Sequence, residues 1–396
     1  MKSDAKVIFH IDLNQFFCSV AILKNPRLKG KAFAIGRENT TKGVISTASY
    51  EARKYGIGAG MPLIDAFRKL PSLIVVDYGH DLYVEYSKKF FKFLSTYVKD
   101  IEQTSIDEGF MDVTDITIKV NRHPLDLAKE IQTRALKELS LPVSIGIAPT
   151  LFLAKMASDM KKPLGITVLR IKDIPKMLYP LDVKEIFGIG KKTYPLLYEK
   201  NIKTIGDFVA KENEGVVRKI VGNTYDGFIL SLSGKSTNIV DPNRYAEHES
   251  MSKSVTFDTP LTTYYEVIEN VMMLADETYA ELRKSKKKTK TVSITLRDTD
   301  FKTITRSKSL TDYTNNKTLL KYYIEELVAD NYDGLPLRLV GAGFSHFVDE
   351  DEEEITLFNY KDVYEKEETL NNLIKDFDKR FGKNSLFFGK NLTDKR

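Results

Sequence analysis

Two adjacent carboxylates, Asp107 and Glu108, stand inside an otherwise apolar, strand-like stretch that reads SIDEGFMDVT from residue 105. Burying charge of one sign is costly unless a cation lies against it. Two like charges about 4 Å apart repel by about 1 kcal/mol in water, and by several times more at a low effective dielectric. The pair therefore predicts a bound divalent ion or another strong cation.

A third acid, Asp12, ends the apolar run KVIFHIDL, which predicts that it lies at the C-terminal end of a strand. Carboxylate oxygens favour Mg²⁺ or Mn²⁺ over Zn²⁺. Strict strand geometry sends Asp107 and Glu108 to opposite faces, so a shared ion needs twist, a bulge or the longer reach of Glu108. From these residues alone, a metal site and surface acids at a strand end are equal alternatives. Because Mg²⁺ often takes phosphate oxygens as its remaining ligands, a metal site would indicate phosphoryl chemistry.

A second group of residues suits phosphate binding and lies in ISTASYEARKYG, from residue 45. A helix that opens at Tyr50 carries Arg53 on the same face, where a phenol hydroxyl and a planar cation can hold a phosphate. The alternative is an ordinary exposed helix face. Lys162 follows an apolar helix over 151–160, and a lysine near a helix end is common.

A third group is the glycine-rich turn IFGIGKKT, from residue 186. A tight turn with Gly188 and Gly190 between two helices exposes backbone N–H groups to a phosphate, and Lys191 and Lys192 add positive charge. This is the helix-hairpin-helix pattern of non-specific DNA binding. A plain helical turn is the alternative.

Composition limits the class of protein. A chain of 396 residues predicts two to four domains, and a net charge of +5 says little about partners. Residues 282–308, however, hold ten Lys and Arg against two Asp, which indicates either polyanion binding or a solvated helix end. The single Cys18 excludes an intrachain disulfide and suits a reducing compartment. No 18-residue apolar span or signal-like N-terminus appears, so we expect a cytoplasmic protein without a membrane segment.

The order of elements predicts an α+β protein. Short, mostly hairpin-joined strands alternate with helices up to about residue 165, which indicates a sheet with helices on one face. A helical, short-looped region follows to about residue 234, and the polar stretch 236–252 is typical of a linker. A new α+β pattern begins at residue 253.

Taken together, these stretches resemble the Y-family translesion DNA polymerases, near the bacterial branch of DNA polymerase IV and UmuC-like proteins. The resemblance spans roughly residues 6–347. Five motifs carry it in one order: FHIDLNQFFCSVA, ISTASYEARKYGIGAGMP, SIDEGFMDVT, SIGIAPTLFLAKMASDMKKPLGI and FGIGKKT.

The resemblance implies roles for individual residues. Asp12, Asp107, Glu108 and the main-chain carbonyl of Leu13 would hold two Mg²⁺ ions, with Mn²⁺ as an alternative. Phe17 matches the steric gate that excludes a 2′-hydroxyl, and the incoming triphosphate would be held by Thr47, Tyr50, Arg53 and Lys162. This chain departs from the pattern at Asn14, often acidic in relatives, and at Gly109, often Ala; neither position is a metal ligand.

The resemblance also implies a right-hand architecture. A ferredoxin-like palm (1–19 and 79–165) would carry small fingers (20–78), a helical thumb with the helix-hairpin-helix (166–238), a linker (239–250), an α+β little finger (251–347) and a tail (348–396). The DNA contacts would come from the thumb turn and the basic cluster, at Gly188, Gly190, Lys191, Lys192, Lys286, Lys287, Lys288 and Arg306.

The function implied is low-fidelity, template-dependent DNA synthesis across lesions by two-metal nucleotidyl transfer. Primer–template DNA and deoxynucleoside triphosphates would be the substrates of a monomer. The tail segment 354–358 resembles a sliding-clamp peptide with Ile355, Leu357 and Phe358 as anchors, although Glu354 replaces its usual Gln; the alternative is a strand that packs on the little finger. A catalytically idle DNA-binding repair factor is the alternative function, and the intact acids favour the enzyme.

Overall fold

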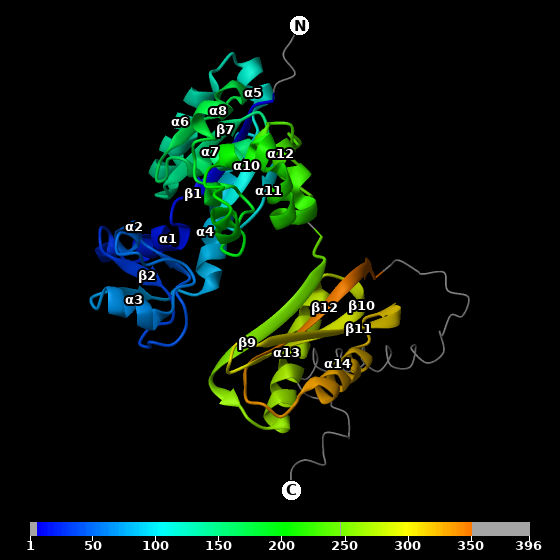
Figure 1. The fold of residues 1–396 in the computed structure, drawn as a ribbon. Helices are drawn as coiled ribbons and strands as arrows, with labels where there is room; N and C mark the ends of the chain where they lie inside the picture. The colour runs from blue at the N-terminus through cyan, green and yellow to red at the C-terminus, as the bar shows by residue number, and fades with distance from the viewer. Residues whose placement is uncertain (1–5, 246, 351–396) are drawn as a thin grey trace. The chain divides into compact units, whose positions relative to one another are not determined.

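The protein is described by a computed structural model, which covers residues 6–245 and 247–350. The chain divides into two compact units, residues 1–248 and 249–396, and each is described by itself (Figure 1). Within residues 6–245 and 247–350, no helix is both long and apolar enough to cross a membrane.

A five-stranded sheet organises the first unit. Its order is β5 (Ile101–Gln103), β6 (Glu108–Asp112), β1 (Ile8–Leu13), β7 (Val143–Ala148) and β8 (Ile166–Val168). All neighbours are antiparallel except β7 and β8. Strand β1 lies in the centre of the sheet and all six of its residues are buried, including His10 and Asp12 in an otherwise apolar sequence.

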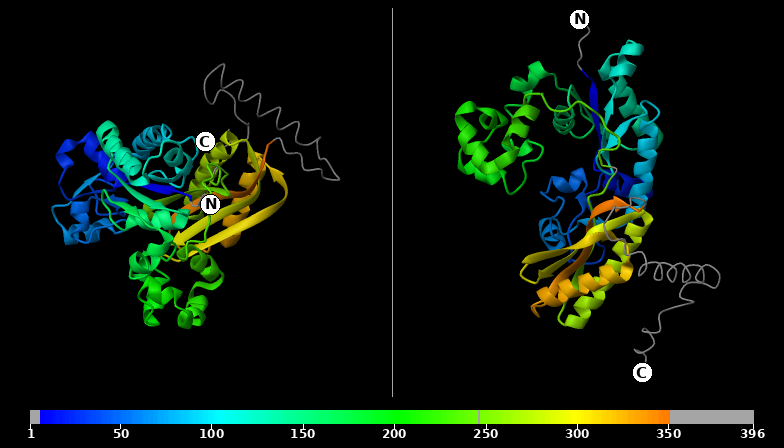
Figure 2. Two further views of the ribbon diagram at one scale, coloured as in Figure 1. Left: turned by 90° about the horizontal axis from the view of Figure 1, so that it is seen from above. Right: turned by 90° about the vertical axis from the view of Figure 1, so that its right-hand side faces the viewer.

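Helices cover both faces of this sheet, so the predicted one-sided layer is wrong. Phe9 and Ile11 of β1 pack with α4 (His80–Leu94) and α6 (Pro124–Arg134), whereas Ile8 packs with α7 (Leu151–Asp159) on the opposite face. Figure 2 shows the helices on either side of the sheet. The physical reason is that β1 presents apolar side chains to both faces, and each face needs a cover.

The rest of the first unit comprises a second small sheet and a group of short helices. The sheet is β3 (Thr47–Ala48), β2 (Phe33–Ile35) and β4 (Ile74–Val76). The remaining helices are α1 (Phe16–Lys24), α2 (Tyr50–Arg53), α3 (Leu63–Lys69), α5 (Thr114–Lys119), α8 (Ile174–Met177), α9 (Tyr194–Glu199), α10 (Ile205–Val209), α11 (Glu214–Val221) and α12 (Tyr225–Leu232). Strand β8 pairs with β7 and so belongs to the large sheet.

The second unit is an antiparallel sheet covered by two helices. The strand order is β11 (Thr303–Thr314), β10 (Lys287–Asp298), β12 (Leu337–Asp349) and β9 (Ser250–Leu261). Helices α13 (Tyr264–Lys284) and α14 (Lys317–Asn331) share one apolar core with these strands. The mixed α+β class predicted from the sequence is confirmed, while the further division of the first unit into palm, fingers and thumb stays a prediction.

Candidate active site

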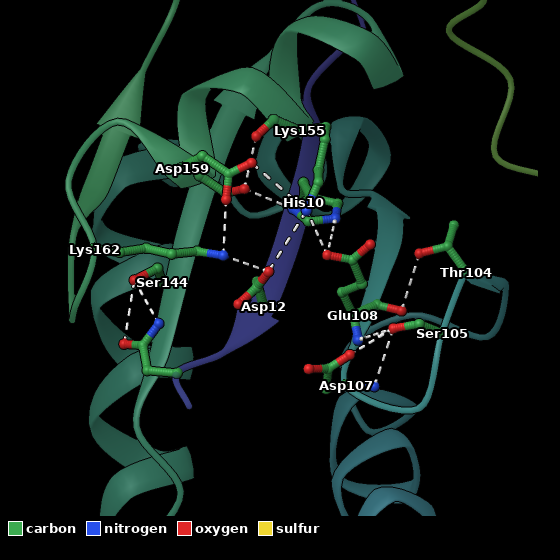
Figure 3. A network of polar contacts seen from close by, with 12 residues as sticks. His10, Asp12, Thr104, Ser105, Asp107, Glu108, Ser144, Lys155, Asp159 and Lys162 are labelled. Carbon is green, nitrogen blue, oxygen red and sulfur yellow. Dashed lines mark hydrogen bonds and ion pairs between the residues drawn. The ribbon is translucent and has the colours of Figure 1, made fainter. Parts of the chain in front are cut away.

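The pairing of β1 with β6 brings the predicted acids to one end of the sheet. Asp12 lies directly opposite Glu108 in the antiparallel register, so the two side chains project from the same face. Asp107 precedes β6 in a turn, and its carbonyl accepts a hydrogen bond from the Leu13 amide at 2.9 Å. The expected conflict of faces between Asp107 and Glu108 does not arise, because only Glu108 lies within the strand (Figure 3).

Ser105 shapes the turn that carries Asp107. Its hydroxyl donates to Asp107 Oδ1 at 2.6 Å and accepts from the backbone amides of Asp107 and Glu108, each at 3.2 Å. The amide of Thr104 donates to the Glu108 carbonyl at 3.1 Å and closes the hairpin. The serine thus fixes the approach of both acidic residues through local hydrogen bonds.

Two lysines contact these carboxylates: Lys155 in the middle of α7 and Lys162, three residues beyond the end of that helix (Figure 3). Lys162 Nζ lies 2.6 Å from Asp12 Oδ2 and 2.7 Å from Asp159 Oδ1. Lys155 Nζ forms an ion pair with Glu108 Oε2 and lies 3.6 Å from both Asp12 Oδ2 and Asp159 Oδ2. Sequence reasoning identified Lys162 but missed Lys155 and Asp159. The signal was the four-residue spacing of Lys155 and Asp159, which places both on one face of α7, with Lys162 three residues further along the chain.

Burial controls the ionisation of this cluster. It raises the pKa of Asp12 to about 6, although Lys162 and Lys155 oppose the shift. Burial also raises the pKa of Asp107. For Lys155, burial alone would lower the pKa, but the carboxylates of Asp159 and Glu108 outweigh it and the pKa is raised. The Lys155 ammonium group therefore stays charged, while the raised pKa of Asp12 makes this acid protonate more readily than an ordinary carboxyl group.

The donor set fits a hard divalent ion. Asp12, Asp107 and Glu108 offer only oxygen, which suits Mg²⁺ and Mn²⁺. Across residues 6–245 and 247–350, no three Asp, Glu, His or Cys side chains are close enough together to hold one ion as they stand. The lysine ammonium groups instead hold Asp12 and Glu108, so a metal would have to take these oxygens from them.

The residues predicted to bind phosphate, Tyr50 and Arg53, are the first and last residues of α2. Tyr50 opens this helix, as expected, and the Arg53 guanidinium lies 4.8 Å from the centre of the Tyr50 ring. The Tyr50 amide donates to Gln15 Oε1 at 2.7 Å, which ties α2 to the turn after β1. Burial raises the pKa of Tyr50, with Arg53 and Lys162 opposing. Thr47 lies on β3, paired with Ile35.

Phe17, the predicted steric gate, is held by an aromatic neighbour. Its ring stacks on Tyr83 of α4, with ring centroids 4.1 Å apart and an angle of 23° between the planes. Sequence reasoning did not identify Tyr83, which follows Phe17 by 66 positions and shows no local pattern. The stack fixes the orientation of the Phe17 ring next to the turn that carries Asn14.

Both departures from the family pattern have a structural reason. Asn14 is buried, donates from Nδ2 to Ser144 Oγ at 2.9 Å and accepts at Oδ1 from the Leu164 amide at 2.7 Å. It thereby ties the end of β1 to the turn after Lys162. At Gly109, an added Cβ would lie 3.0 Å from the Glu102 carbonyl oxygen and 3.0 Å from the Phe91 ring, so a side chain there meets close neighbours.

The predicted DNA-binding residues lie at several separate places. In the thumb turn, Gly188 has a φ of 100°, a conformation that favours glycine, and Lys191 and Lys192 are exposed. Gly190 has open space around it. A 3₁₀ turn (Val183–Glu185), rather than an α-helix, precedes this hairpin, and α9 follows it.

In the second unit, the basic cluster surrounds the turn between α13 and β10. Lys286 occupies that turn with a φ of 54°, and Lys287 pairs with Asp349 at 3.2 Å. Lys288 follows on β10, while Arg306 on β11 donates to Asn331 Oδ1 at 3.1 Å. The predicted clamp anchors Ile355, Leu357 and Phe358 lie outside the described residues.

Comparison with known proteins gives matches over nearly the whole chain. Residues 11–159 match the impB/mucB/samB family, and residues 248–357 match the C-terminal domain of that family. The chain is 39% identical over 392 residues to DNA polymerase IV of Oceanobacillus iheyensis, and the matched region covers 98% of this chain and 93% of the relative. It is 36% identical to DNA polymerase IV 1 of Bacillus subtilis, and the matched region covers 96% of this chain and 92% of the relative.

Solved structures show the same fold. A Y-family DNA polymerase chimera of Dbh and Dpo4 superposes with a TM-score of 0.74 at 26% identity, covering 87% of this chain and 99% of that chain. An insertion ternary complex of Dbh DNA polymerase gives a TM-score of 0.60 at 26% identity with the same coverage. These similarities confirm the predicted right-hand polymerase fold class.

Proposed function

The chain belongs to the impB/mucB/samB family of Y-family DNA polymerases, and from this premise we propose that the end of β1 and β6 is its nucleotidyl-transfer centre. The protein is a DNA-directed DNA polymerase of the translesion class. One observation supports the site above all: Asp12 and Glu108 face each other across two paired strands, and Asp107 stands in the adjoining turn. The alternative of a catalytically idle repair factor lacks support.

The metal ligands would be Asp12, Asp107, Glu108 and the carbonyl of Leu13. Two Mg²⁺ ions, or Mn²⁺ in their place, would lower the pKa of the primer 3′-hydroxyl and stabilise the pyrophosphate leaving group. The backbone brings these residues to one end of the sheet, but their side chains would still have to leave the lysines and move together to share an ion. Ser105 holds the Asp107 carboxylate, and the β1–β6 register holds Asp12 opposite Glu108. Such preorganisation reduces the cost of assembling the site.

The incoming triphosphate would be bound by the cations and hydroxyl groups around α2 and α7. Arg53 presents a planar guanidinium held over the Tyr50 ring, Tyr50 offers its phenol, and Thr47 offers a hydroxyl from β3. Lys162, which now contacts Asp12, would supply an ammonium group to the phosphates. This arrangement places positive charge where negative charge grows in phosphoryl transfer.

Sugar selection would rest on Phe17. The stack on Tyr83 would hold its ring in place against a 2′-hydroxyl. Phe17→Ala should therefore admit ribonucleotides, and Tyr83→Leu should admit them to a smaller extent. Unaltered sugar discrimination in Phe17→Ala would remove this residue as the gate.

DNA would be held by the thumb turn at Gly188, Gly190, Lys191 and Lys192 and by the basic cluster with Lys286, Lys287, Lys288 and Arg306. If these groups make about six phosphate contacts, the logarithm of affinity should fall with the logarithm of salt at a slope of about −5. The pairing of Lys287 with Asp349 makes it the weakest contributor of the cluster.

We also propose that the protein acts as a monomer in the cytoplasm and binds a sliding clamp through residues 354–358. Deletion of this segment should abolish clamp-stimulated synthesis and leave basal synthesis intact, and unchanged stimulation would refute the proposal. The Glu354 substitution for the usual Gln removes one donor, which would weaken binding by about 1 kcal/mol.

Primer extension with Mg²⁺ on undamaged and abasic templates tests the proposed function. The wild-type protein should extend both, Asp107→Ala should extend neither, and Asp115→Ala should match the wild type. Asp115 is a suitable control because it is an exposed acid on α5 that pairs with Lys119 at 3.6 Å. Equal incorporation by wild type and Asp107→Ala would overturn the assignment.

A further inference from the structure

The turn after β1 carries two consecutive amide side chains, Asn14 and Gln15, to which the proposed function gives no role. Asp12 and Leu13 end the strand, and Asn14 and Gln15 connect it to α1. Gln15 has a left-handed backbone conformation, with a φ of 42° and a ψ of 49°, which a residue with a side chain rarely adopts. Such a conformation persists only where surrounding contacts hold it, and it occurs often at functional sites.

Asn14 reaches the segment that carries Lys162. Its side chain is buried, and its Oδ1 accepts a hydrogen bond from the Leu164 amide at 2.7 Å. Because a backbone amide can only donate, this contact fixes which end of the Asn14 side chain is the oxygen, and Nδ2 donates to Ser144 Oγ at 2.9 Å. Gln132 of α6 holds the same residue from the other side and donates to the Leu164 carbonyl at 3.0 Å. The residue two positions after Lys162 is thus tethered at both its N–H and its carbonyl.

Gln15 reaches the second group of predicted phosphate-binding residues. Its Oε1 accepts a hydrogen bond from the Tyr50 amide at 2.7 Å. This amide belongs to the first turn of α2, where an N–H group has no partner within the helix. Gln15 supplies the missing acceptor, so the start of the helix that carries Tyr50 and Arg53 is joined to the turn after β1.

The two groups of phosphate-binding residues lie near one another and near the same acid. Burial raises the pKa of Tyr50, and the Arg53 guanidinium opposes that rise. The Lys162 ammonium group also lowers this pKa, whereas the Asp12 carboxylate raises it, so both act on the phenol. These side chains come from the end of β1, from α2 and from the segment after α7, and only contacts between those stretches can set their spacing. The turn after β1 provides such contacts from two adjacent positions.

We propose that Asn14 and Gln15 are positioning residues for the incoming triphosphate. Asn14 sets the place of the Lys162 ammonium group, whereas Gln15 sets the place of α2. Because both side chains start from the strand end that carries Asp12, they hold the phosphate-binding groups at a fixed spacing from this predicted metal ligand. The inference rests on the nucleotide contacts in the proposed function.

Equilibrium binding of a correct deoxynucleoside triphosphate tests the proposal without any chemical step. The nucleotide is titrated, by calorimetry and with Mg²⁺, into the full chain bound to a primer–template whose primer ends in a dideoxynucleotide. Asn14→Leu and Gln15→Leu should each weaken nucleotide binding about fivefold, the net effect of one hydrogen bond. Asn14→Asp should recover most of the affinity, because a carboxylate oxygen still accepts from the Leu164 amide. Asn213→Leu is the matched control: it removes an amide hydrogen bond to the Asp207 carbonyl, at 2.8 Å between α10 and α11, and should bind nucleotide like the wild type.

Double variants separate positioning from a general loss of structure. If Asn14 acts through Lys162, Asn14→Leu should cause no further loss of affinity in Lys162→Met. If Gln15 acts through α2, Gln15→Leu should cause no further loss in a chain with both Tyr50→Phe and Arg53→Met. The exchanged pairs, Asn14→Leu with Arg53→Met and Gln15→Leu with Lys162→Met, should show additive losses. Losses that add in every pair, coupling of only one of the two residues, or wild-type affinity in both single variants would refute the proposal.

Gln132→Met keeps the proposal testable if Asn14→Leu does not fold. Gln132 is half-buried on α6 and tethers the Leu164 carbonyl, so its loss should weaken nucleotide binding through the same segment. The effect should disappear in Lys162→Met. Wild-type affinity in Gln132→Met, or a loss that persists in Lys162→Met, would then overturn the role of this tether.

Failure of this inference is distinguishable from failure of the proposed function. If Lys162→Met and Arg53→Met themselves bind nucleotide like the wild type, the proposed triphosphate site is wrong. If these two variants lose affinity while Asn14→Leu and Gln15→Leu retain it, the triphosphate site stands and the positioning roles are wrong.

Discussion

Replacement of Lys155 by methionine should destabilise the first unit and make it depend on divalent ions. The ammonium group lies 3.6 Å from both Asp12 Oδ2 and Asp159 Oδ2 and pairs more closely with Glu108. At an effective dielectric of 20, each 3.6 Å pair is worth about 5 kcal/mol before desolvation is subtracted. Loss of one partner from a buried ion pair costs about 3–5 kcal/mol in practice. Because Lys162 still neutralises Asp12 and Asp159 is partly exposed, we expect the lower end, about 3 kcal/mol.

Calorimetry is the suitable assay, because the chain contains no tryptophan for a fluorescence signal. For a unit of roughly 240 residues, 3 kcal/mol corresponds to a midpoint about 6–12 °C lower. Mg²⁺ should raise this midpoint more in Lys155→Met than in the wild type, because the ion replaces a missing positive charge between the same carboxylates.

Lys89→Met is the matched control for this prediction. Lys89 pairs with Glu85 at 2.6 Å on α4, but both side chains are more than half exposed. Exposed pairs contribute little to stability, so its midpoint should equal that of the wild type, with or without Mg²⁺. If Lys155→Met also unfolds at the wild-type midpoint, or gains no more from Mg²⁺ than the wild type does, the electrostatic account of the cluster is wrong.

Three further predictions concern packing, pH and the linker. Gly146→Ala would place a Cβ 2.0 Å from the Ala154 carbonyl oxygen, so α7 must move off the sheet; calorimetry should show a loss of about 3 kcal/mol, and an unchanged midpoint would contradict the packing. Because burial raises the pKa of Asp12 to about 6, Mn²⁺ affinity without DNA should fall as the pH falls through about 6 and level off above 7; a midpoint near pH 4 would contradict this shift. Arg244 donates to the buried Glu102 at 2.6 Å, so Arg244→Met should speed hydrogen exchange at the amide of residue 241, which donates to the same carboxylate; unchanged exchange would show that the anchor is unnecessary.

The features of the site that could be predicted from sequence are those set by local pattern. The apolar run before Asp12 predicted a strand end, and Asp12 is the fifth of six residues in β1. The placement of Arg53 on one face with Tyr50 supposed a helix that opens at Tyr50, and α2 does begin there, capped by Ser49. Both depend on interactions within a few positions of the chain, which a sequence displays directly.

The features that sequence reasoning missed depend on contacts between distant segments. Asp107 was assigned to a strand. The alternation of apolar and polar residues cannot show that hydrogen bonds from Ser105 hold Asp107 in a turn before β6 begins. Lys155 resembled any other helical lysine until α7 was packed on β1. Lys287 was counted with the basic cluster, but its partner Asp349 lies at the end of another strand. Each of these points concerns where a side chain finds its partner, which spacing does not determine.

The contacts of Lys162 explain how a site for anions and a site for cations can coincide. The same ammonium group that the family pattern assigns to the triphosphate lies 2.6 Å from Asp12, a predicted metal ligand. A divalent ion that took the Asp12 oxygen would release this lysine, and a triphosphate would supply the negative charge that the released lysine needs. An ion without nucleotide would leave Lys162 with only Asp159, and nucleotide without an ion would compete with Asp12 for the lysine. We therefore expect metal and nucleotide to bind cooperatively, and Lys162→Met should weaken that coupling more than it weakens Mn²⁺ binding alone.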